Sequence, residues 1–418
     1  MDNDRAFLSF DLFNSIPDGK MRDTLINLAI IFYCLQAAPI FVEHEVELHP
    51  VYGKSNQHTG YTAKVIIGES KEELALLLDI ATTIIWIYPS KYTEILPENK
   101  QAYSFLQSET FKKENPLLLV EAYGSRSVAL YTEWDKISLN LLDGTCLDFT
   151  DFPFCKVKII IWPKREDYQR IDGLFGIGVP YGNSGDSSRN NQSYLVITVA
   201  LPPLDSNKTA ILTLGGRNNQ SCDLNYETVE PLRLINENTG QERQVAPSPS
   251  HLIASNQSGN HYEFKYNSIK MGDVMSSIVS FAYLSTIEPF ISVPDDFLSK
   301  IITNLNATFD SSENKYMVQC KGSVAHNTYE PFEISTDSNT YVIPPQHFII
   351  KHNPDDMLCE LAFRKNERIF YYLYASENLI ERYSDIDPNI IVLGIPFFHQ
   401  YCIMLKPRGS NINFAPII

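Results

Sequence analysis

Residue types that bind metals or form catalytic triads occur in this sequence, but their spacing favours neither use. His44 and His49 flank the alternating segment HEVELH. On a strand these side chains would point to opposite faces, which makes a poor metal site, so a solvated strand is predicted here. The nine histidines show no spacing that identifies a Ser-His-Asp triad, and the cysteines form no C-x-x-C motif. Gly215-Gly216 closes an apolar segment but lacks the helix that a phosphate-binding loop needs. These patterns predict no metal and no cofactor.

Two acidic motifs are expected to form turns rather than to do chemistry. Asp172 precedes Gly173, and Asp355-Asp356 follow a His-Asn-Pro sequence. Asp, Asn, Pro and Gly favour turns because of their backbone preferences and local hydrogen bonds.

The elements that carry these residues are expected to be mainly β-strands. Segments rich in β-branched and aromatic residues that end at Gly, Pro or Asn are typical strands; they are 61–67, 75–86, 156–162, 194–201, 210–214 and 341–343. One helix is predicted from Val293 to about Leu305, because two Asp follow Pro294 and the apolar residues Phe297, Ile301, Ile302 and Leu305 share one face. The polar segment 236–260 is predicted to be an exposed loop.

Composition limits the classes of protein and partner. The 418-residue chain is 44% hydrophobic and 20% charged, which excludes a disordered or collagen-like chain and predicts two or three units. Its 34 Lys and Arg against 50 Asp and Glu give a net charge of −16. Nucleic acids and anionic membranes both require a basic face, so neither is expected as a partner.

The N-terminal region has the pattern of a secretory signal. The apolar stretch 25–38 follows Met21-Arg22 and ends in Ala37-Ala38; it is short for a spanning helix, which needs about 20 residues, but suits a signal-peptide core. Residues 21–38 are therefore predicted to be a signal peptide. Residues 1–20 then come from an upstream start codon or form a cytoplasmic stub, and a buried helix is the alternative for the apolar stretch.

Sequons and cysteines also indicate secretion. Five Asn-x-Ser/Thr sequons predict N-glycosylation; they begin at Asn191, Asn207, Asn219, Asn256 and Asn306. Cys34 would leave with the signal, and the six remaining cysteines suit three disulfides; they are Cys146, Cys155, Cys222, Cys320, Cys359 and Cys402.

Seven segments in a fixed order resemble the pepsin-like aspartic protease family. They are LLLDIATTIIWIYPS (76–90), VEAYGSRSVAL (120–130), IDGLFGIG (171–178), AILTLGG (210–216), the segment 290–305, KYMVQC (315–320) with Cys359, and VLGIPFFHQYCIMLKPRGSNINFAP (392–416). The resemblance runs from about Gly60 to the end. It implies an all-β, bilobal fold with a central cleft and a few short helices, with an N-terminal lobe at 39–222 and a C-terminal lobe at 223–418.

The resemblance also implies site residues and disulfides. Asp79 matches the first catalytic Asp, Trp86 the family's Trp, and Tyr123-Gly124 the tip of the flap; plain packing is an equal alternative for Trp86 and Tyr123. Cys320–Cys359 matches the second-lobe disulfide. Cys222–Cys402 is similar to an extra pair in nematode members, which leaves Cys146 with Cys155.

The second catalytic loop departs from the family pattern. Ser285-Thr286-Ile287 aligns with the second Asp-Thr-Gly, so that Ser285 replaces the second Asp. The family's mechanism needs two carboxylates about 3 Å apart that share one proton, and Ser does not titrate near neutrality. In the first loop Ile80 cannot make the cross-lobe hydrogen bond of the family's Thr. Glu288 and Asp273 are the nearest acids to Ser285, but neither has the expected context.

The region before the first expected strand is unlike a typical pro-segment. Active members usually carry a basic pro-segment of a few dozen residues, whereas about twenty residues, with three Glu, separate Ala38 from Tyr61. An inactive protein needs no such plug; a divergent pro-segment is the alternative.

These features predict a monomeric homologue that has lost peptidase activity and binds a peptide, protein or other ligand in the interlobe cleft. It is expected to be secreted or in a lysosome-like lumen, with no membrane contact after signal cleavage. One alternative is a divergent endopeptidase that uses Asp79. Another is a decoy that sequesters protease inhibitors.

Overall fold

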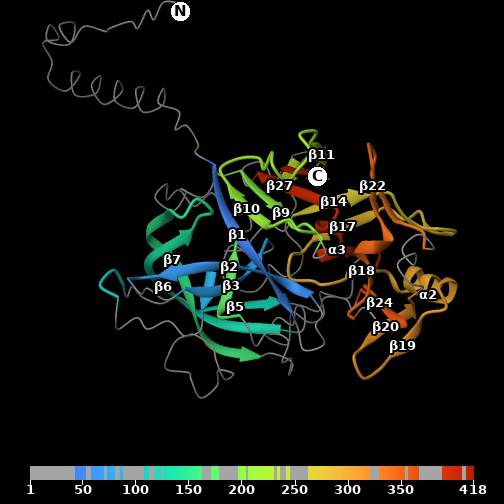
Figure 1. The fold of residues 1–418 in the computed structure, drawn as a ribbon, viewed down its shortest axis with the longest axis horizontal. Helices are drawn as coiled ribbons and strands as arrows, with labels where there is room; N and C mark the ends of the chain where they lie inside the picture. Colours follow the sequence, from blue (N-terminus) through green and yellow to red (C-terminus); the bar gives the residue numbers. More distant parts are fainter. Residues whose placement is uncertain are drawn as a thin grey trace, which may run out of the picture. The chain divides into compact units, whose positions relative to one another are not determined.

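The computed structural model describes most of the chain after residue 42. The described residues are 43–52, 58–69, 73–80, 85–87, 108–112, 118–123, 126–161, 171–177, 196–203, 206–229, 233–235, 242–244, 262–320, 329–353, 356–366, 388–406 and 411–418. The chain divides into units 1–42 and 43–418, and everything below concerns the second (Figure 1). The segments 1–20 and 21–38 lie outside the described residues. Within the described part, no helix is long and apolar enough to cross a membrane.

One large sheet dominates the first half of the chain and recruits three strands from the second half. Its order is β11-β28-β27-β9-β10-β1-β2-β3-β8-β4-β7-β6-β5. The strands are β1 (His44–Tyr52), β2 (His58–Ile67), β3 (Leu74–Asp79), β4 (Ile85–Ile87), β5 (Leu118–Tyr123), β6 (Arg126–Asn140), β7 (Cys146–Ile161), β8 (Gly173–Gly176), β9 (Ile197–Ala200), β10 (Ala210–Leu214), β11 (Glu227–Val229), β27 (Tyr401–Lys406) and β28 (Asn411–Pro416).

The second half of the chain forms smaller sheets. A five-stranded sheet has the order β14-β17-β26-β18-β25, with β14 (Glu263–Tyr266), β17 (Ser280–Leu284), β26 (Ile391–Leu393), β18 (Ile291–Val293) and β25 (Phe363–Lys365). Two four-stranded sheets are β16-β15-β21-β22 and β19-β20-β24-β23. Their strands are β15 (Ser268–Met271), β16 (Val274–Ser276), β19 (Thr308–Asp310), β20 (Lys315–Gln319), β21 (Phe332–Ser335), β22 (Thr340–Ile343), β23 (Ile349–Ile350) and β24 (Leu358–Leu361).

Helices are short and few among the described residues. They are α2 (Asp295–Asn304), α3 (Ile395–Phe398) and the 3-10 helix η8 (Pro345–His347). The sequence predicted α2 correctly: it follows Pro294, carries two Asp in its first turn, and buries Phe297, Leu298 and Ile301. Acidic residues there complement the positive end of the helix dipole.

Strand burial explains why the apolar segments were predicted well. β10 has the predicted bounds of 210–214, and all five of its residues are buried. In β3 every residue but Ala75 is buried. Strands covered on both faces are apolar throughout rather than alternating, so their composition alone identifies them.

Two segments differ from the predictions. β1 lies between β10 and β2 in the sheet, whereas HEVELH was expected to be a solvated strand that precedes the first family-like strand near Tyr61. Val46 and Leu48 of β1 are buried, so residues 44–52 form an integral strand rather than a plug. The segment 236–260 contains β13 (Glu242–Gln244), which pairs with β12 (Arg233–Ile235); its other residues lie outside the described part.

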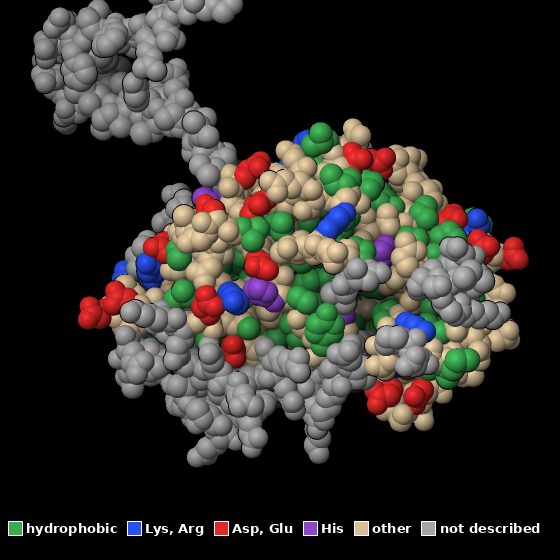
Figure 2. Space-filling view, viewed as in Figure 1, with side chains coloured by type: hydrophobic (Ala, Val, Ile, Leu, Met, Phe, Trp, Pro, Cys, Tyr) green, Lys and Arg blue, Asp and Glu red, His purple; other side chains and the backbone are tan. Residues whose placement is uncertain are grey.

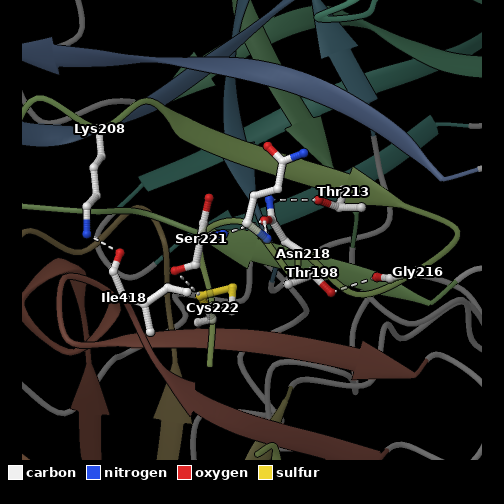
Figure 3. Close-up of a disulfide and its surroundings, with 10 residues drawn as sticks. Thr198, Lys208, Thr213, Gly216, Asn218, Ser221, Cys222 and Ile418 are labelled. Carbon is white, nitrogen blue, oxygen red and sulfur yellow. Dashed lines mark hydrogen bonds between the residues drawn. A yellow bond between two sulfur atoms is a disulfide. The ribbon is translucent and has the colours of Figure 1, made fainter. Parts of the chain in front are cut away.

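Two of the three predicted disulfides are correct. Cys222 pairs with Cys402 and Cys320 with Cys359. Figure 3 shows the first, which fastens the segment after β10 to β27. Close by, the side chain of Asn218 is buried and its Oδ1 accepts the backbone N–H of Ser221 at 2.8 Å.

The predicted Cys146–Cys155 disulfide is wrong. Both residues belong to β7, where residues rise about 3.3 Å each. Nine positions therefore separate them by about 30 Å, whereas a disulfide needs Cα atoms within about 7 Å. Cys146 is an exposed free thiol.

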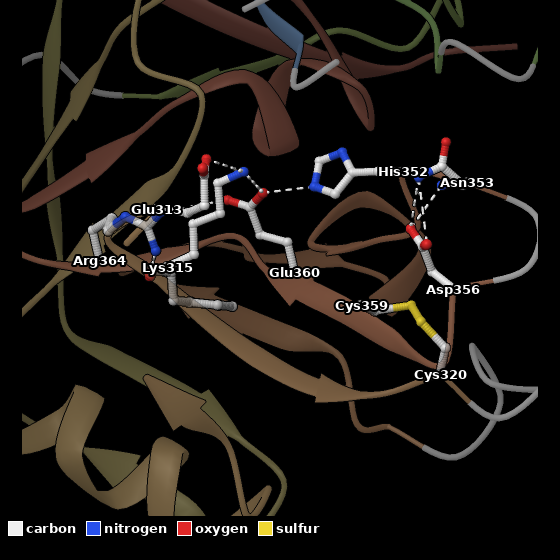
Figure 4. A network of polar contacts seen from close by, with 10 residues as sticks. Glu313, Lys315, Cys320, His352, Asn353, Asp356, Cys359, Glu360 and Arg364 are labelled. Atoms are coloured by element: carbon white, nitrogen blue, oxygen red, sulfur yellow. Dashed lines mark hydrogen bonds and ion pairs between the residues drawn. A yellow bond between two sulfur atoms is a disulfide. The ribbon is translucent and has the colours of Figure 1, made fainter. Parts of the chain in front are cut away.

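The second half also contains a buried charge network next to the Cys320–Cys359 disulfide (Figure 4). Glu360 of β24 is 0% exposed, and its Oε2 lies 3.4 Å from Lys315 Nζ and 2.8 Å from His352 Nε2. Its other carboxylate oxygen lies 3.3 Å from Arg364. The guanidinium of Arg364 also lies 3.9 Å from the centre of the Phe290 ring. A carboxylate this deep is tolerated because it is paired and hydrogen-bonded.

Charged groups on the surface follow the overall composition. On the face shown in Figure 2, acidic side chains are scattered over the molecule, and Lys and Arg do not gather into a broad patch.

Candidate functional site

The same strand arrangement occurs in each half of the chain. In the first half β3 pairs parallel with β8, which pairs antiparallel with β4. In the second half β17 pairs parallel with β26, which pairs antiparallel with β18. An apolar-apolar-Gly sequence occurs in each half: LFG at 174–176 lies in β8, and VLG at 392–394 covers the end of β26 and the following Gly394. The two halves of the chain therefore repeat the same local structure.

Strand register places Asp79 and Ser285 at equivalent positions. Leu78 lies opposite Phe175 in the first half, and Leu284 lies opposite Leu393 in the second. Asp79 and Ser285 are the next residues along the chain. Asp79 pairs with Gly176, and Ser285 reaches the corresponding strand by donating its backbone N–H to the Leu393 carbonyl at 3.1 Å.

Asp79 is held by strand pairing on the buried side of β3. Its side chain is 0% exposed, and its backbone carbonyl accepts the N–H of Ile177 at 2.9 Å. The preceding residues of LALLLD anchor it, since Leu76, Leu77 and Leu78 are all buried. A carboxylate at the end of such an apolar strand has little freedom to move.

Ser285 is held equally firmly but brings a hydroxyl instead of a carboxylate. It is 8% exposed. A Cβ on the neighbouring Gly394 would lie 2.1 Å from the Glu288 carbonyl oxygen and 2.2 Å from that of Phe290. Only glycine fits there, so the backbones of the second loop and the segment after β26 pack in direct contact.

The hydroxyl of Thr286 joins the two loops. Its Oγ1 donates to the Leu78 carbonyl at 2.7 Å and accepts the backbone N–H of Ile80 at 3.3 Å. Thr286 thus bonds to the residues on both sides of Asp79. Ile80 takes part only through its backbone, because its side chain is apolar and fully buried. Among the described residues the side-chain bridge therefore runs in one direction.

The alternative acids lie in different surroundings. Glu288 is half-buried, and its carbonyl accepts the N–H of Ile395 at 2.8 Å. Asp273 is exposed in the turn between β15 and β16. Neither occupies the position equivalent to Asp79.

The remaining predicted site residues are only partly described. Trp86 is fully buried and pairs with Leu174 of β8. Tyr123 ends β5 opposite Arg126, so the predicted flap segment forms a hairpin. The Tyr123 side chain and Gly124 lie outside the described residues.

Asp172 has a role that the sequence did not predict. Instead of forming a turn, its N–H donates to the Ala75 carbonyl at 2.8 Å and its Oδ2 accepts the Ala75 N–H at 2.9 Å. It thereby extends the β3–β8 pairing at the start of β3, the end of the strand opposite to Asp79. This role could have been predicted from the position of Asp172 in the apolar segment IDGLFGIG, because an acid in such a segment needs a buried hydrogen-bond partner. The other predicted turn is present, since Asn353 donates its N–H to Asp356 Oδ2 at 2.8 Å.

A family model described as eukaryotic aspartyl protease matches residues 60–202 and 248–417. The chain belongs to this family. The resemblance found in the sequence is therefore correct, and the aspartyl protease fold accounts for the all-β, bilobal arrangement with its repeated strands. No curated protein matches the chain significantly.

The aspartyl protease family explains what the paired loops are for. In a working dyad each loop carries a carboxylate, and one is base while the other is acid. In this member the described loops contribute Asp79 and Ser285 at the equivalent positions. The arrangement positions one acid and one neutral hydroxyl, and Thr286 holds the loops together.

Three of the five predicted glycosylation sites lie in the described part of the chain. Asn207, Asn219 and Asn306 are all exposed, as an attached glycan requires. Asn191 and Asn256 lie outside the described residues.

Proposed function

We propose that this protein is a secreted member of the eukaryotic aspartyl protease family that has lost peptidase activity and binds a peptide or protein ligand. The observation that carries the proposal is the register position of Ser285, which is equivalent to that of Asp79. At the position equivalent to Asp79 the second loop offers a hydroxyl in place of the carboxylate that would share the proton of a dyad. Loss of one acid–base partner typically removes about 10²–10⁴-fold in rate.

The retained scaffold supports a binding role. Thr286 still joins the loops, Gly394 still permits their close backbone packing, and both strand repeats are intact. A protease-like cleft holds an extended chain mainly through backbone hydrogen bonds, which do not need the dyad.

Secretion is supported by the covalent chemistry of the chain. The Cys222–Cys402 and Cys320–Cys359 disulfides are typical of oxidising compartments, and members of the family are typically secreted or lysosomal.

The second candidate function is a divergent endopeptidase that uses Asp79. It is favoured by the retention of Asp79 at the end of β3 with its strand pairing intact. The two candidates differ in one measurable property, the cleavage of peptide bonds.

The test uses the full chain made through a secretory pathway. Cleavage of a denatured protein substrate is measured from about pH 2 to 7, with and without a pepstatin-type inhibitor, beside Asp79→Asn. We expect no cleavage above background from either protein. Pepstatin-sensitive cleavage that Asp79→Asn abolishes would establish the endopeptidase instead.

Binding is tested separately by titration calorimetry with peptide libraries and the same inhibitor. We expect micromolar or tighter binding of some extended peptides by both the wild type and Asp79→Asn, since backbone contacts carry it. A folded protein that binds none of these would contradict the ligand-binding part of the proposal.

A further inference from the structure

Three histidines far apart in the sequence come together in the folded chain. His58 begins β2, His347 ends η8, and His399 follows α3. The rings of His58 and His399 are stacked, with centroids 5.6 Å apart and planes 8° apart. The ring of His347 lies 5.9 Å from that of His399. The cluster therefore joins the first half of the chain to the second.

Polar but uncharged side chains contact the cluster within the described part of the chain. Tyr61 of β2 packs edge-on against His58 at 4.5 Å, and its hydroxyl lies 3.4 Å from His399 Nε2. Tyr52 of β1 lies 5.8 Å from His58. On the other side, His347 Nε2 lies 3.1 Å from Gln400 Oε1.

The two stacked rings lack what a buried imidazolium needs. His58 is 8% exposed, and its ring nitrogens make no hydrogen bond of normal geometry within the described part of the chain. The Gly60 backbone favours the charged ring, but its effect is smaller than that of burial. Neither His58 nor His399 forms an ion pair with a described carboxylate; the ion-paired histidines there are His49 and His352. A charged ring in this position would lose its hydration without compensation.

The titration of both rings follows from this environment. Burial lowers the pKa of His58 from 6.5 to about 4. Burial, together with the neighbouring His58 and His347, lowers the pKa of His399 well below 6.5, and burial raises that of Tyr61. All of these groups are therefore neutral at pH 7.

Metal binding is a weaker explanation of the cluster. Within the described ranges no three His, Cys, Asp or Glu side chains are arranged to hold a metal ion. The close ring stacking instead favours a contact that persists only while both rings are uncharged, since two stacked imidazolium ions would repel each other.

We propose that the ring contacts among His58, His347 and His399 form an acid-sensitive joint between the two halves of the chain. The rings stay in contact while the imidazoles are neutral, and they separate when the imidazoles take up protons. Opening would separate the start of β2 from the segment that follows α3. None of the three histidines is part of a catalytic loop, although a Cβ on Gly60, two residues after His58, would lie 3.4 Å from the Thr286 carbonyl oxygen.

The sign of the pH effect is fixed by linkage. His58 binds a proton below about pH 6.5 in the unfolded chain but only below about pH 4 in the folded one. Its contribution to stability is therefore lost as the pH falls from 6.5 to 4. For His58 alone the ratio of folded to unfolded protein changes by up to roughly 300-fold.

The test compares hydrogen exchange of the full chain at pH 7 and pH 4, corrected for the intrinsic pH dependence of exchange. Acid should accelerate exchange in residues 58–62 and 399–402 at least about tenfold more than in β15 and β21, which lie elsewhere in the second half. His58→Phe keeps the ring stack but cannot be charged, and should remove most of this local response. His44→Phe on β1 is the matched control and should leave it unchanged.

Two outcomes would contradict the proposal of an acid-sensitive joint. One is an acid response in His58→Phe equal to that of the wild type; the other is acceleration spread evenly over the sheets. If His58→Phe does not fold, His399→Phe removes the other stacked imidazole and should suppress the same local response.

Discussion

Replacing Thr286 with Val should destabilise the protein through the loss of one hydroxyl. The change keeps the shape of the side chain but leaves the Leu78 carbonyl and the Ile80 N–H without their shared partner. Thr286 is fully buried, so water cannot easily replace it. An unsatisfied buried group costs about 1–3 kcal/mol, and the 3.3 Å bond to Ile80 belongs near the lower end of that range. We therefore expect the free energy of unfolding to fall by about 2–4 kcal/mol.

The assay is equilibrium urea unfolding at pH 7 with the disulfides intact. Thr303→Val provides a matched control, because its Oγ1 donates to the Ser299 carbonyl at 2.9 Å on the exposed side of α2. This control should change the free energy of unfolding by no more than about 0.5 kcal/mol. Thr286→Ser keeps the hydroxyl and should recover more than half of the loss. If Thr286→Val and Thr303→Val were equally stable, the bridge would not join the loops as described.

Three further predictions concern charge and modification. Glu360→Gln should lower the free energy of unfolding by about 3–5 kcal/mol, because it removes the buried carboxylate that Lys315, His352 and Arg364 share. Urea unfolding measures this, and a loss below about 1 kcal/mol would contradict the pairing. Burial raises the pKa of Glu263 despite a hydrogen bond from Tyr283, so the contribution of this carboxyl to stability is lost as the pH rises. Glu263→Gln should therefore stabilise the protein at pH 7 but not at pH 3, and melting temperatures at both pH values measure this. Secreted protein should carry glycans at Asn207 and Asn306, detected by mass spectrometry before and after enzymatic deglycosylation; unmodified asparagine at both would argue against passage through the secretory pathway.

Much of the fold could be predicted because its strands are compositionally distinct. β10 is an apolar run covered on both faces, and α2 has both a start signal and an apolar face. The strand at β1 was predicted from its alternating pattern, but its burial was not, because charged residues such as Glu45 and Glu47 are equally common in exposed strands. Only the position of β1 between β10 and β2 makes Val46 and Leu48 core residues.

The parts of the site that local sequence motifs define could be predicted, whereas contacts between distant residues could not. The equivalence of Asp79 and Ser285 was expected from the motifs, and strand register places them at equivalent positions. The Cys146–Cys155 bond was predicted because these two cysteines were left over from an even number. An even count says nothing about the distance between two residues, and here both lie far apart on one strand. The stacking of His58 on His399 could not be predicted, because no sequence pattern relates residues so distant along the chain.

The place of β27 and β28 in the large sheet also determines when that sheet can be finished during protein synthesis. β27 pairs with β9, yet its residues emerge from the ribosome long after those of β9, at about 5–20 residues per second some 10–40 s later. Throughout that interval the nascent chain presents β9 as an open sheet edge, the kind of surface that pairs with other chains. Cys222 likewise waits for Cys402. A chaperone or oxidoreductase that shields this edge would have its greatest effect before residue 401 is made.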